Sequence, residues 1–248
     1  MISIKTSEEI EIMRAGGKIL SHVMKELQGE IKPGISTKEL DRAAEALILQ
    51  SGAQLAFKGY NGFPAAICTS VNEEVVHSVP SSRKILSEGD IITLDIGLIW
   101  KGYYLDMART FPVGDIKLEV KKLLDSTEEA LKIGIDEAKS GNTFGDIGYA
   151  VQKHIEEKGF NVVRELCGHG IGKDLHESPQ ITNYGKKKTG EIIKEGMVFC
   201  IEPMVTMGGW EVQTGKDGYS FETADQSLSA HFEDTVAITS QGTEVLTK

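Results

Sequence analysis

The chain has 248 residues, which is enough for one large domain or two small ones. Its apolar content of 40% and charged content of 26% are those of an ordinary soluble globular protein. The net charge is 27 − 37 = −10, which repels nucleic-acid phosphates and argues against a direct nucleic-acid function.

The N-terminal residues and the cysteines indicate the compartment. Acidic side chains stand where a signal peptide needs an apolar core, and no apolar run approaches the roughly 20 residues of a membrane-spanning helix. Cys68, Cys167 and Cys200 are an odd, widely spaced set without a CxxC pair, so no disulfide framework is indicated. We expect a protein of the reducing cytoplasm.

Helical periodicity of apolar residues predicts four helices, in two pairs. The first two helices open with Thr or Ser followed three residues later by Glu, the spacing of a capping box. The expected helices begin at Thr6, Ser36, about Lys117 and Thr143.

Runs rich in β-branched residues predict strands after each helix pair. Two helices followed by strands, twice over, is an order typical of an α+β protein. The expected strands cover residues 65–71, 91–100, 110–113, 197–201 and 236–239.

Features that recur 107 positions apart indicate an internal duplication. A Glu-Gly pair opens the strand of Asp95, and another opens the strand of Glu202, with 202 − 95 = 107. We therefore expect a single catalytic domain, 1–248, in which two related halves, about 6–112 and 113–248, share one sheet and cannot fold separately.

Four carboxylates in apolar segments give the strongest chemical signal: Asp95, Asp106, Glu202 and Glu233. Burying one charged carboxylate costs on the order of several kcal/mol unless a cation or a shared proton compensates. For a single acid, a strand-end charge or a buried ion pair is the alternative explanation. Because Arg109 is the one basic residue near these runs, four such acids favour divalent cations.

Three histidines are candidate partners of these acids. Glycines on both sides of His169 permit close approach to a metal, although a glycine-loop histidine without a ligand role is the alternative. One histidine with four carboxylates suits two ions of Mn, Fe, Co or Zn, and a water shared between them can become hydroxide and attack a carbonyl. His77 and His176 each precede Pro by three residues, so they are either substrate hydrogen-bonding groups or turn histidines.

The ordered motifs resemble type I methionine aminopeptidase in its short, bacterial-style form. The resemblance covers nearly the whole chain and implies the α+β pita-bread fold: two pseudo-symmetric halves that share an antiparallel sheet, with helices packed on its outer face. The motifs that carry it are Gly59-Tyr-Asn-Gly-Phe-Pro64, the strands of Asp95 and Asp106, Cys167-Gly-His-Gly-Ile-Gly172, His176-Glu-Ser-Pro-Gln180, Ile201-Glu-Pro-Met204, Lys216-Asp-Gly218 and Ser227-Leu-Ser-Ala230.

The resemblance implies that the enzyme removes the N-terminal methionine of nascent proteins and peptides, preferring a small second residue. Glu202 would carry the proton from the metal-bridged water to the leaving amine. Two divalent ions (Co, Mn, Fe or Zn) would be held by Asp95, Asp106, His169, Glu202 and Glu233.

The resemblance also implies the substrate contacts. His77 would contact the scissile amide or the second residue, His176 the carbonyl oxygen, and Asp95 the region of the free N-terminus. Asn61, Leu175 and Tyr219 depart from common family residues, so we expect altered affinity or inhibitor preference. The implied substrate-binding set is Phe57, Tyr60, Phe63, Cys68, His77, Leu175, His176 and Tyr219.

Two alternative functions fit the sequence less well than methionine removal. A peptidase that cuts before proline is opposed by the methionine-type motifs around Tyr60 and His169, and a metal-free binding module by the retained ligand set. The basic run Lys186–Lys188 is a solvated loop or a transient ribosome contact. We expect a monomer without membrane contact.

Overall fold

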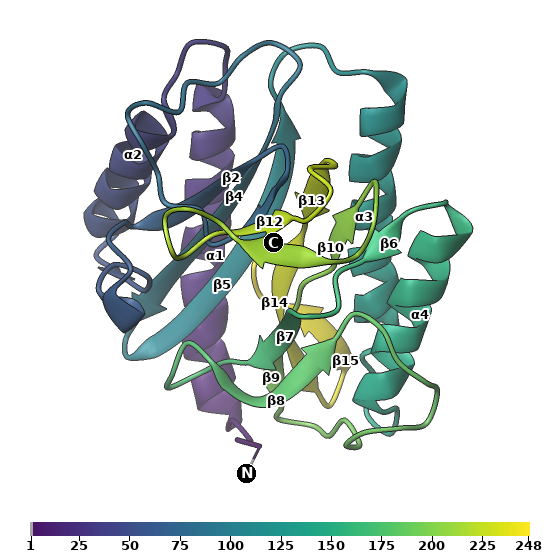
Figure 1. The fold of residues 1–248 in the computed structure, drawn as a ribbon. Helices are drawn as coiled ribbons and strands as arrows, with labels where there is room; N and C mark the ends of the chain where they lie inside the picture. Colours follow the sequence, from purple (N-terminus) through teal and green to yellow (C-terminus); the bar gives the residue numbers. More distant parts are fainter. Residues whose placement is uncertain (1) are drawn as a thin grey trace.

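In the computed structural model, which describes residues 2–248, one pair of helices lies against each half of a large curved sheet, at the left and at the right of Figure 1. All four predicted helices are confirmed, with ends within a few residues of those expected. Their bounds are Ser7–Glu30 (α1), Thr37–Gln50 (α2), Leu118–Glu137 (α3) and Phe144–Glu157 (α4).

Side-chain caps fix where three of these helices begin. Both predicted capping boxes form, at Thr6 for α1 and Ser36 for α2. A third forms at the start of α4, where Asp146 takes the place of the Glu. Its carboxylate accepts a hydrogen bond from the main-chain N–H of Thr143. Such caps satisfy main-chain N–H groups at helix starts and each stabilises by about 1 kcal/mol.

One curved antiparallel sheet of nine strands forms the centre of the molecule. Its strands run in the order β1-β4-β5-β14-β9-β7-β8, with β2 added beside β4 and β15 beside β14. The bounds are Gln54–Leu55 (β1), Ile67–Val71 (β2), Ile91–Trp100 (β4), Tyr103–Pro112 (β5), Cys167–Gly170 (β7), Glu177–Thr182 (β8), Val198–Ile201 (β9), Glu233–Thr239 (β14) and Gly242–Val245 (β15).

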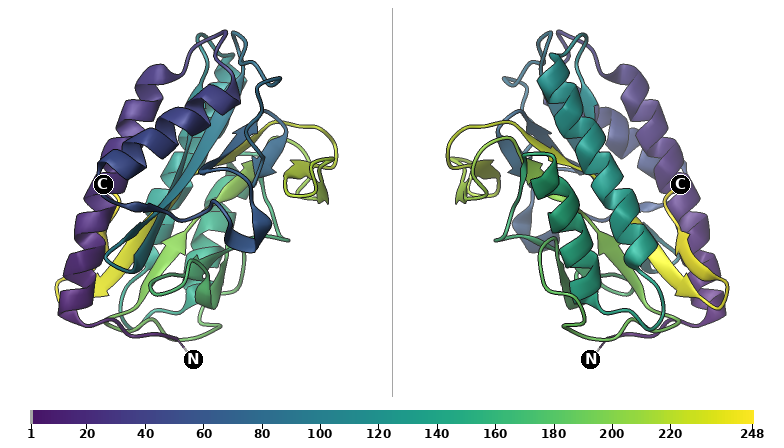
Figure 2. Two further views of the ribbon diagram at one scale, coloured as in Figure 1. Left: turned by 90° about the vertical axis from the view of Figure 1, so that its left-hand side faces the viewer. Right: turned by 90° about the vertical axis from the view of Figure 1, so that its right-hand side faces the viewer.

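Two small antiparallel sheets lie beside the large one, in the orders β13-β10-β6 and β11-β12-β3. In Figure 2 the β11–β12 segment projects from the side opposite α1. The bounds are Glu74–Val76 (β3), Asn161–Val162 (β6), Met204–Thr206 (β10), Val212–Thr214 (β11), Phe221–Thr223 (β12) and Ser229–His231 (β13), with a short 3-10 turn at Tyr60–Gly62.

All five predicted strands are present, and two are longer than predicted. The strand expected at 110–113 begins at Tyr103, and the strand expected at 236–239 begins at Glu233. Polar residues such as Asp106 and Arg109 interrupt the apolar pattern in the added parts, which is why the pattern alone placed the starts too late.

Equivalent main-chain contacts occur in the two halves of the chain. An isolated bridge joins Ser36 to Ile85, and another joins Thr143 to Ile192, with 143 − 36 = 107 and 192 − 85 = 107. These are the contacts that an internal repeat of this length leads one to expect. The single-domain description of the chain stays a prediction.

Each helix pair covers its own part of the sheet with buried apolar side chains. Leu20 and Leu27 of α1 are fully buried in one apolar cluster with residues of β4 and β5. Leu123 of α3 and Val151 of α4 are fully buried in a second cluster with Phe199 of β9. Complete burial of such a side chain stabilises the fold by about 1.5–3 kcal/mol. Among the described residues, no helix combines the length and apolarity that crossing a membrane requires.

Candidate metal centre and substrate cavity

Three neighbouring strands place three carboxylates on one face of the large sheet. Asp95 on β4 pairs with Ala108 on β5, and Ala108 pairs with Glu233 on β14. Asp106 lies two residues before Ala108 and therefore faces the same side.

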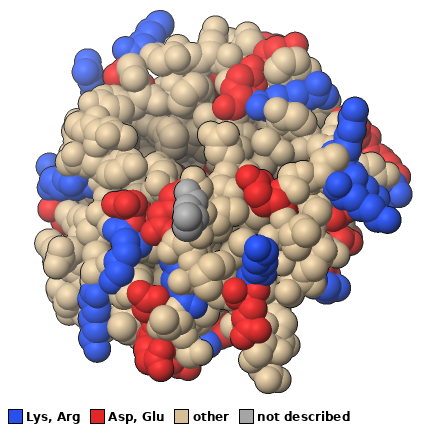
Figure 3. All heavy atoms as spheres, turned by 90° about the horizontal axis from the view of Figure 1, so that it is seen from below, with Lys and Arg blue, Asp and Glu red and all other residues tan. Residues whose placement is uncertain are grey.

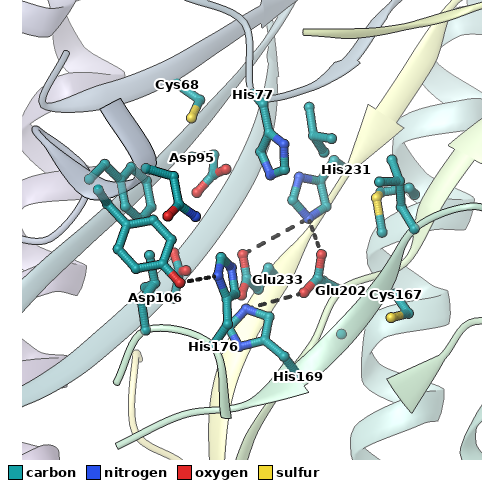
Figure 4. Close-up of a pocket in the computed structure, with 18 of the residues that line it drawn as sticks. Cys68, His77, Asp95, Asp106, Cys167, His169, His176, Glu202, His231 and Glu233 are labelled. Carbon is teal, nitrogen blue, oxygen red and sulfur yellow. Dashed lines mark hydrogen bonds and ion pairs between the residues drawn. The ribbon is translucent and has the colours of Figure 1, made fainter. Parts of the chain in front are cut away.

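Glu202 and His169 complete this cluster from the second half of the chain. Glu202 directly follows β9, and His169 lies on β7, beside a bulge at Gly170. A Cβ on Gly168 would lie 2.4 Å from the Cys200 carbonyl oxygen, so only glycine lets β7 approach β9 this closely. As a result, His169 Nε2 lies 3.5 Å from Glu202 Oε1 (Figure 4).

Burial and mutual repulsion raise the pKa values of the carboxylates. Burial raises the pKa of Asp95 from its usual 3.8 to about 7. Burial and then the neighbouring carboxylates raise the pKa values of Asp106, Glu202 and Glu233 well above their usual range. Burial lowers the pKa of His169 to about 3, so its ring is neutral, the form that binds metals.

No basic side chain of the described residues neutralises the cluster. Arg109, the nearest one, binds Asp234 at 2.7 Å and the main-chain oxygens of Ala108 and Glu233. Three buried carboxylate oxygens have no hydrogen-bond partner, and each such orphan is costly. These oxygens are Asp95 Oδ1, Asp106 Oδ1 and Glu233 Oε1.

The donor set fits divalent cations. Ligand atoms of Asp95, Asp106 and Glu233 lie within 4.8 Å of one another, and so do those of His169, Glu233 and Cys200. Burial raises the pKa of the Cys200 thiol well above its usual range, so the thiol stays protonated and is a poor ligand. Carboxylates with imidazole form a hard site of the kind that Mn, Fe, Co and Zn accept.

This cluster forms the floor of a cavity of about 540 Å³. The structure brings every residue of the expected metal and substrate sets to its lining. The side chains of Phe57, Phe63, Cys68 and Leu175 are buried in the wall. Tyr219 stands at the rim, 36% exposed, and its hydroxyl donates to the Gly62 carbonyl at 2.9 Å.

His77 and His176 face this cavity from opposite halves of the chain (Figure 4). His77 has a positive φ of 61°, an uncommon backbone conformation for a residue other than glycine. Surrounding protein atoms lower the pKa of His77 to about 4 although its side chain opens to the cavity. His176 Nδ1 lies 2.9 Å from the Tyr60 hydroxyl, and its ring packs edge-on against His169.

One ionisable side chain of the floor, His231, was not among the site residues predicted from the sequence. It lines the cavity 1% exposed, and burial lowers its pKa to about 3. Its position two residues before Glu233 was the available signal, because residues two apart face the same side of an extended chain.

Charged side chains are mixed in sign on the face seen from below. Figure 3 shows basic and acidic residues interspersed there, around a hollow bordered mainly by uncharged residues. A continuous basic surface, which nucleic-acid binding requires, is not seen in this view.

Comparison with known proteins identifies the family. The model of metallopeptidase family M24 matches residues 11–240. Methionine aminopeptidase 1 of Bacillus subtilis (strain 168) is 51% identical over 248 residues, 100% of each chain. The crystal structure of methionine aminopeptidase from Thermotoga maritima is 42% identical, with a TM-score of 0.98 over 100% of both chains. Prolidase from Pyrococcus furiosus is 28% identical, with a TM-score of 0.79 over 99% of this chain and 65% of the prolidase.

The chain therefore belongs to metallopeptidase family M24 and has its pita-bread fold. Within that family it groups with the methionine aminopeptidases, because their similarity is higher and extends over the full length of both proteins. The resemblance seen in the sequence motifs, and the expectation of a hydrolase of this type, are confirmed.

Proposed function

We propose that this M24 enzyme removes the N-terminal methionine from nascent proteins and peptides, with a preference for a small second residue. The observation that supports this most is the single cavity that joins an uncompensated carboxylate floor to a largely apolar wall. The floor supplies the hydrolytic chemistry, and the wall supplies a site for an unbranched apolar side chain.

Two divalent ions, of Co, Mn, Fe or Zn, fit the floor. The residues that would hold them are Asp95, Asp106, His169, Glu202 and Glu233, whose ligand atoms converge there. When bound, such ions activate water and polarise a carbonyl group. The hard oxygen-rich set accepts several of these metals.

Glu202 is assigned the proton transfer. Burial raises its pKa well above the usual range, and a raised pKa makes the carboxylate a stronger base toward water. In this role Glu202 accepts a proton from the attacking water and delivers it to the leaving amine.

The two facing histidines are assigned to the scissile peptide bond. When the Tyr60 hydroxyl donates to His176 Nδ1, the ring carries its proton on Nε2 and can donate it to the carbonyl oxygen of the substrate. His77 is neutral because its pKa is lowered to about 4, and it hydrogen-bonds the scissile amide or the second residue.

The wall is assigned the methionine side chain. The residues proposed to contact it are Phe57, Tyr60, Phe63, Cys68, Leu175 and Tyr219, together with the ring of His77. Aromatic rings and sulfur favour contact with a thioether. The free amine binds near Asp95. Because His77 and His176 border the space beyond the scissile bond, a large second side chain would be crowded.

We further propose a cytoplasmic monomer that meets nascent chains at the ribosome. The three cysteines are free, as a reducing compartment favours. The exposed Lys186–Lys188 loop is the proposed ribosome contact. If replacement of all three lysines leaves ribosome co-sedimentation unchanged, the loop is a solvated one.

Methionine release tests the proposal directly. The metal-loaded protein should release methionine from Met-Ala-Ser and should not cut a matched peptide that carries proline in the second position and another first residue. Absence of methionine release with Mn, Fe, Co and Zn would exclude the proposed activity. Cleavage restricted to bonds before proline would favour the prolidase alternative, and a protein that binds no metal would favour a binding module.

A further inference from the structure

His231 is buried without a hydrogen-bond partner. It is 1% exposed, and neither ring nitrogen has a partner among the described residues. An unsatisfied buried polar group costs about 1–3 kcal/mol, so a histidine that served only the core would be expected to be bonded. The ring therefore requires a partner in the cavity that it lines.

The main chain holds this ring in place. The His231 N–H donates to Thr110 Oγ1 at 2.8 Å, and the Thr110 hydroxyl donates to the His231 carbonyl at 2.9 Å. The strand β13 also pairs His231 with Met204 of β10. The imidazole is thus positioned without any bond of its own, as a preorganised ligand would be.

The ring points at the two glutamates of the floor (Figure 4). His231 Nε2 lies 3.8 Å from Glu202 Oε2 and 3.9 Å from Glu233 Oε2. These separations exceed the 2.7–3.2 Å of a hydrogen bond. They lie within the roughly 4.2 Å that two atoms can span when each is about 2.1 Å from one shared ion.

We propose that His231 is a further ligand of this centre, binding through Nε2 the ion that Glu202 and Glu233 also bind. The inference rests on the metal centre proposed above. It gives the centre a second imidazole besides His169, which strengthens binding of Zn, Co and Fe relative to purely oxygen-seeking ions. In this respect the site differs from the five-residue set that the sequence predicts.

Scalar coupling between metal and nitrogen tests this bond. The protein is labelled with ¹⁵N-histidine, freed of metal, loaded with ¹¹³Cd²⁺ as the probe and studied by NMR, with each ring assigned through its own backbone. Coupling exists only across a bond. The expected result is coupling to two imidazoles, those of His169 and His231.

Two variants add an independent readout. His231→Gln should lose one of the two couplings and bind Zn²⁺ at least about tenfold more weakly in a chelator competition. The matched control, His22→Gln at an exposed position of α1, should keep both couplings and the parental affinity. If His231→Gln does not fold, the assigned couplings of the parent protein still decide the question.

The outcomes separate this inference from the metal centre itself. Coupling to His169 alone overturns the role of His231 and leaves the centre standing. Coupling to no imidazole overturns the proposed centre and the inference together. Coupling to both rings, with one lost in His231→Gln, supports both.

Discussion

The floor and the wall of the cavity are built differently. The floor lies on paired strands, where the register Asp95–Ala108–Glu233 fixes the carboxylates relative to one another. Much of the wall comes from turns, such as the one at Tyr60–Gly62 and the segment around Tyr219, which contact each other through few bonds. The proposed metal ligands thus stand on paired strands or directly beside them, as functional sites require.

The residues at which the sequence motifs are expected to differ from the resembled family also separate wall from floor. Asn61, Leu175 and Tyr219 all lie in the wall, and none lies in the floor. A wall residue changes contacts with a side chain, whereas a floor residue changes the charge balance of a buried cluster. Substitutions in the floor should therefore abolish turnover, and those in the wall should shift selectivity.

Glu202→Gln should have the largest effect, because it removes the proposed proton carrier and one charge of the floor. We expect kcat on Met-Ala-Ser to fall by about 10²–10⁴-fold with little change in KM. The melting temperature of the metal-free variant should be equal to or above that of the parent, since one buried charge is gone. Parental turnover, or loss of the folded state, would contradict the assigned role.

His176→Gln should have the next largest effect. Removal of one donor to the developing oxyanion costs about 10²–10³-fold in kcat. Tyr60→Phe, which removes only the bond that orients the ring, is the matched control and should lose less. If the variant raises KM and leaves kcat unchanged, His176 binds the substrate but does not stabilise the developing oxyanion.

The metal-free protein should lose stability as pH rises. The pKa of Asp95 is about 7 in the folded state and usually 3.8, so the folded state binds more protons between these values. The contribution of Asp95 to the free energy of unfolding is fully present below about pH 4. It falls by on the order of a few kcal/mol as the pH rises through about 7. Thermal melts at pH 5 and pH 8 measure it, and added metal should restore the loss at pH 8.

Leu175→Ala should have the smallest effect, because it changes only the wall. Enlarging an apolar pocket removes contacts worth about 1–3 kcal/mol. We expect KM for Met-Ala-Ser to rise severalfold while kcat falls less. Leu175→Phe, which restores an aromatic ring, should shift inhibitor preference; an unchanged KM in both variants would place the methionine side chain elsewhere.

Much of the floor could be predicted from the sequence. Asp95 and Asp106 are ionisable residues inside apolar strand segments, where an uncompensated charge is not expected. The repeat of 107 positions links Asp95 to Glu202, with 202 − 95 = 107. For His231 the sequence carried only a weak signal, its position two residues before Glu233, because a lone histidine is usually a core residue. Its approach to Glu202 depends on the break between β13 and β14.

The wall and the small sheets could be predicted less well. Strands of two to four residues carry too little alternation to be distinguished from loops, and half of β7 is glycine. The wall residues were located through family resemblance, since an isolated Phe57 or Leu175 has the sequence pattern of an ordinary core residue. Their convergence depends on contacts between distant turns.

Metal analysis of anaerobically purified protein tests the central claim most directly. We predict up to two equivalents of a divalent transition metal per chain, retained by the parent and lost from an Asp106→Asn, Glu233→Gln double variant that still folds. Methionine release from Met-Ala-Ser should follow the metal content. A parent protein that binds no divalent metal, or a double variant that binds as much as the parent, would contradict the account.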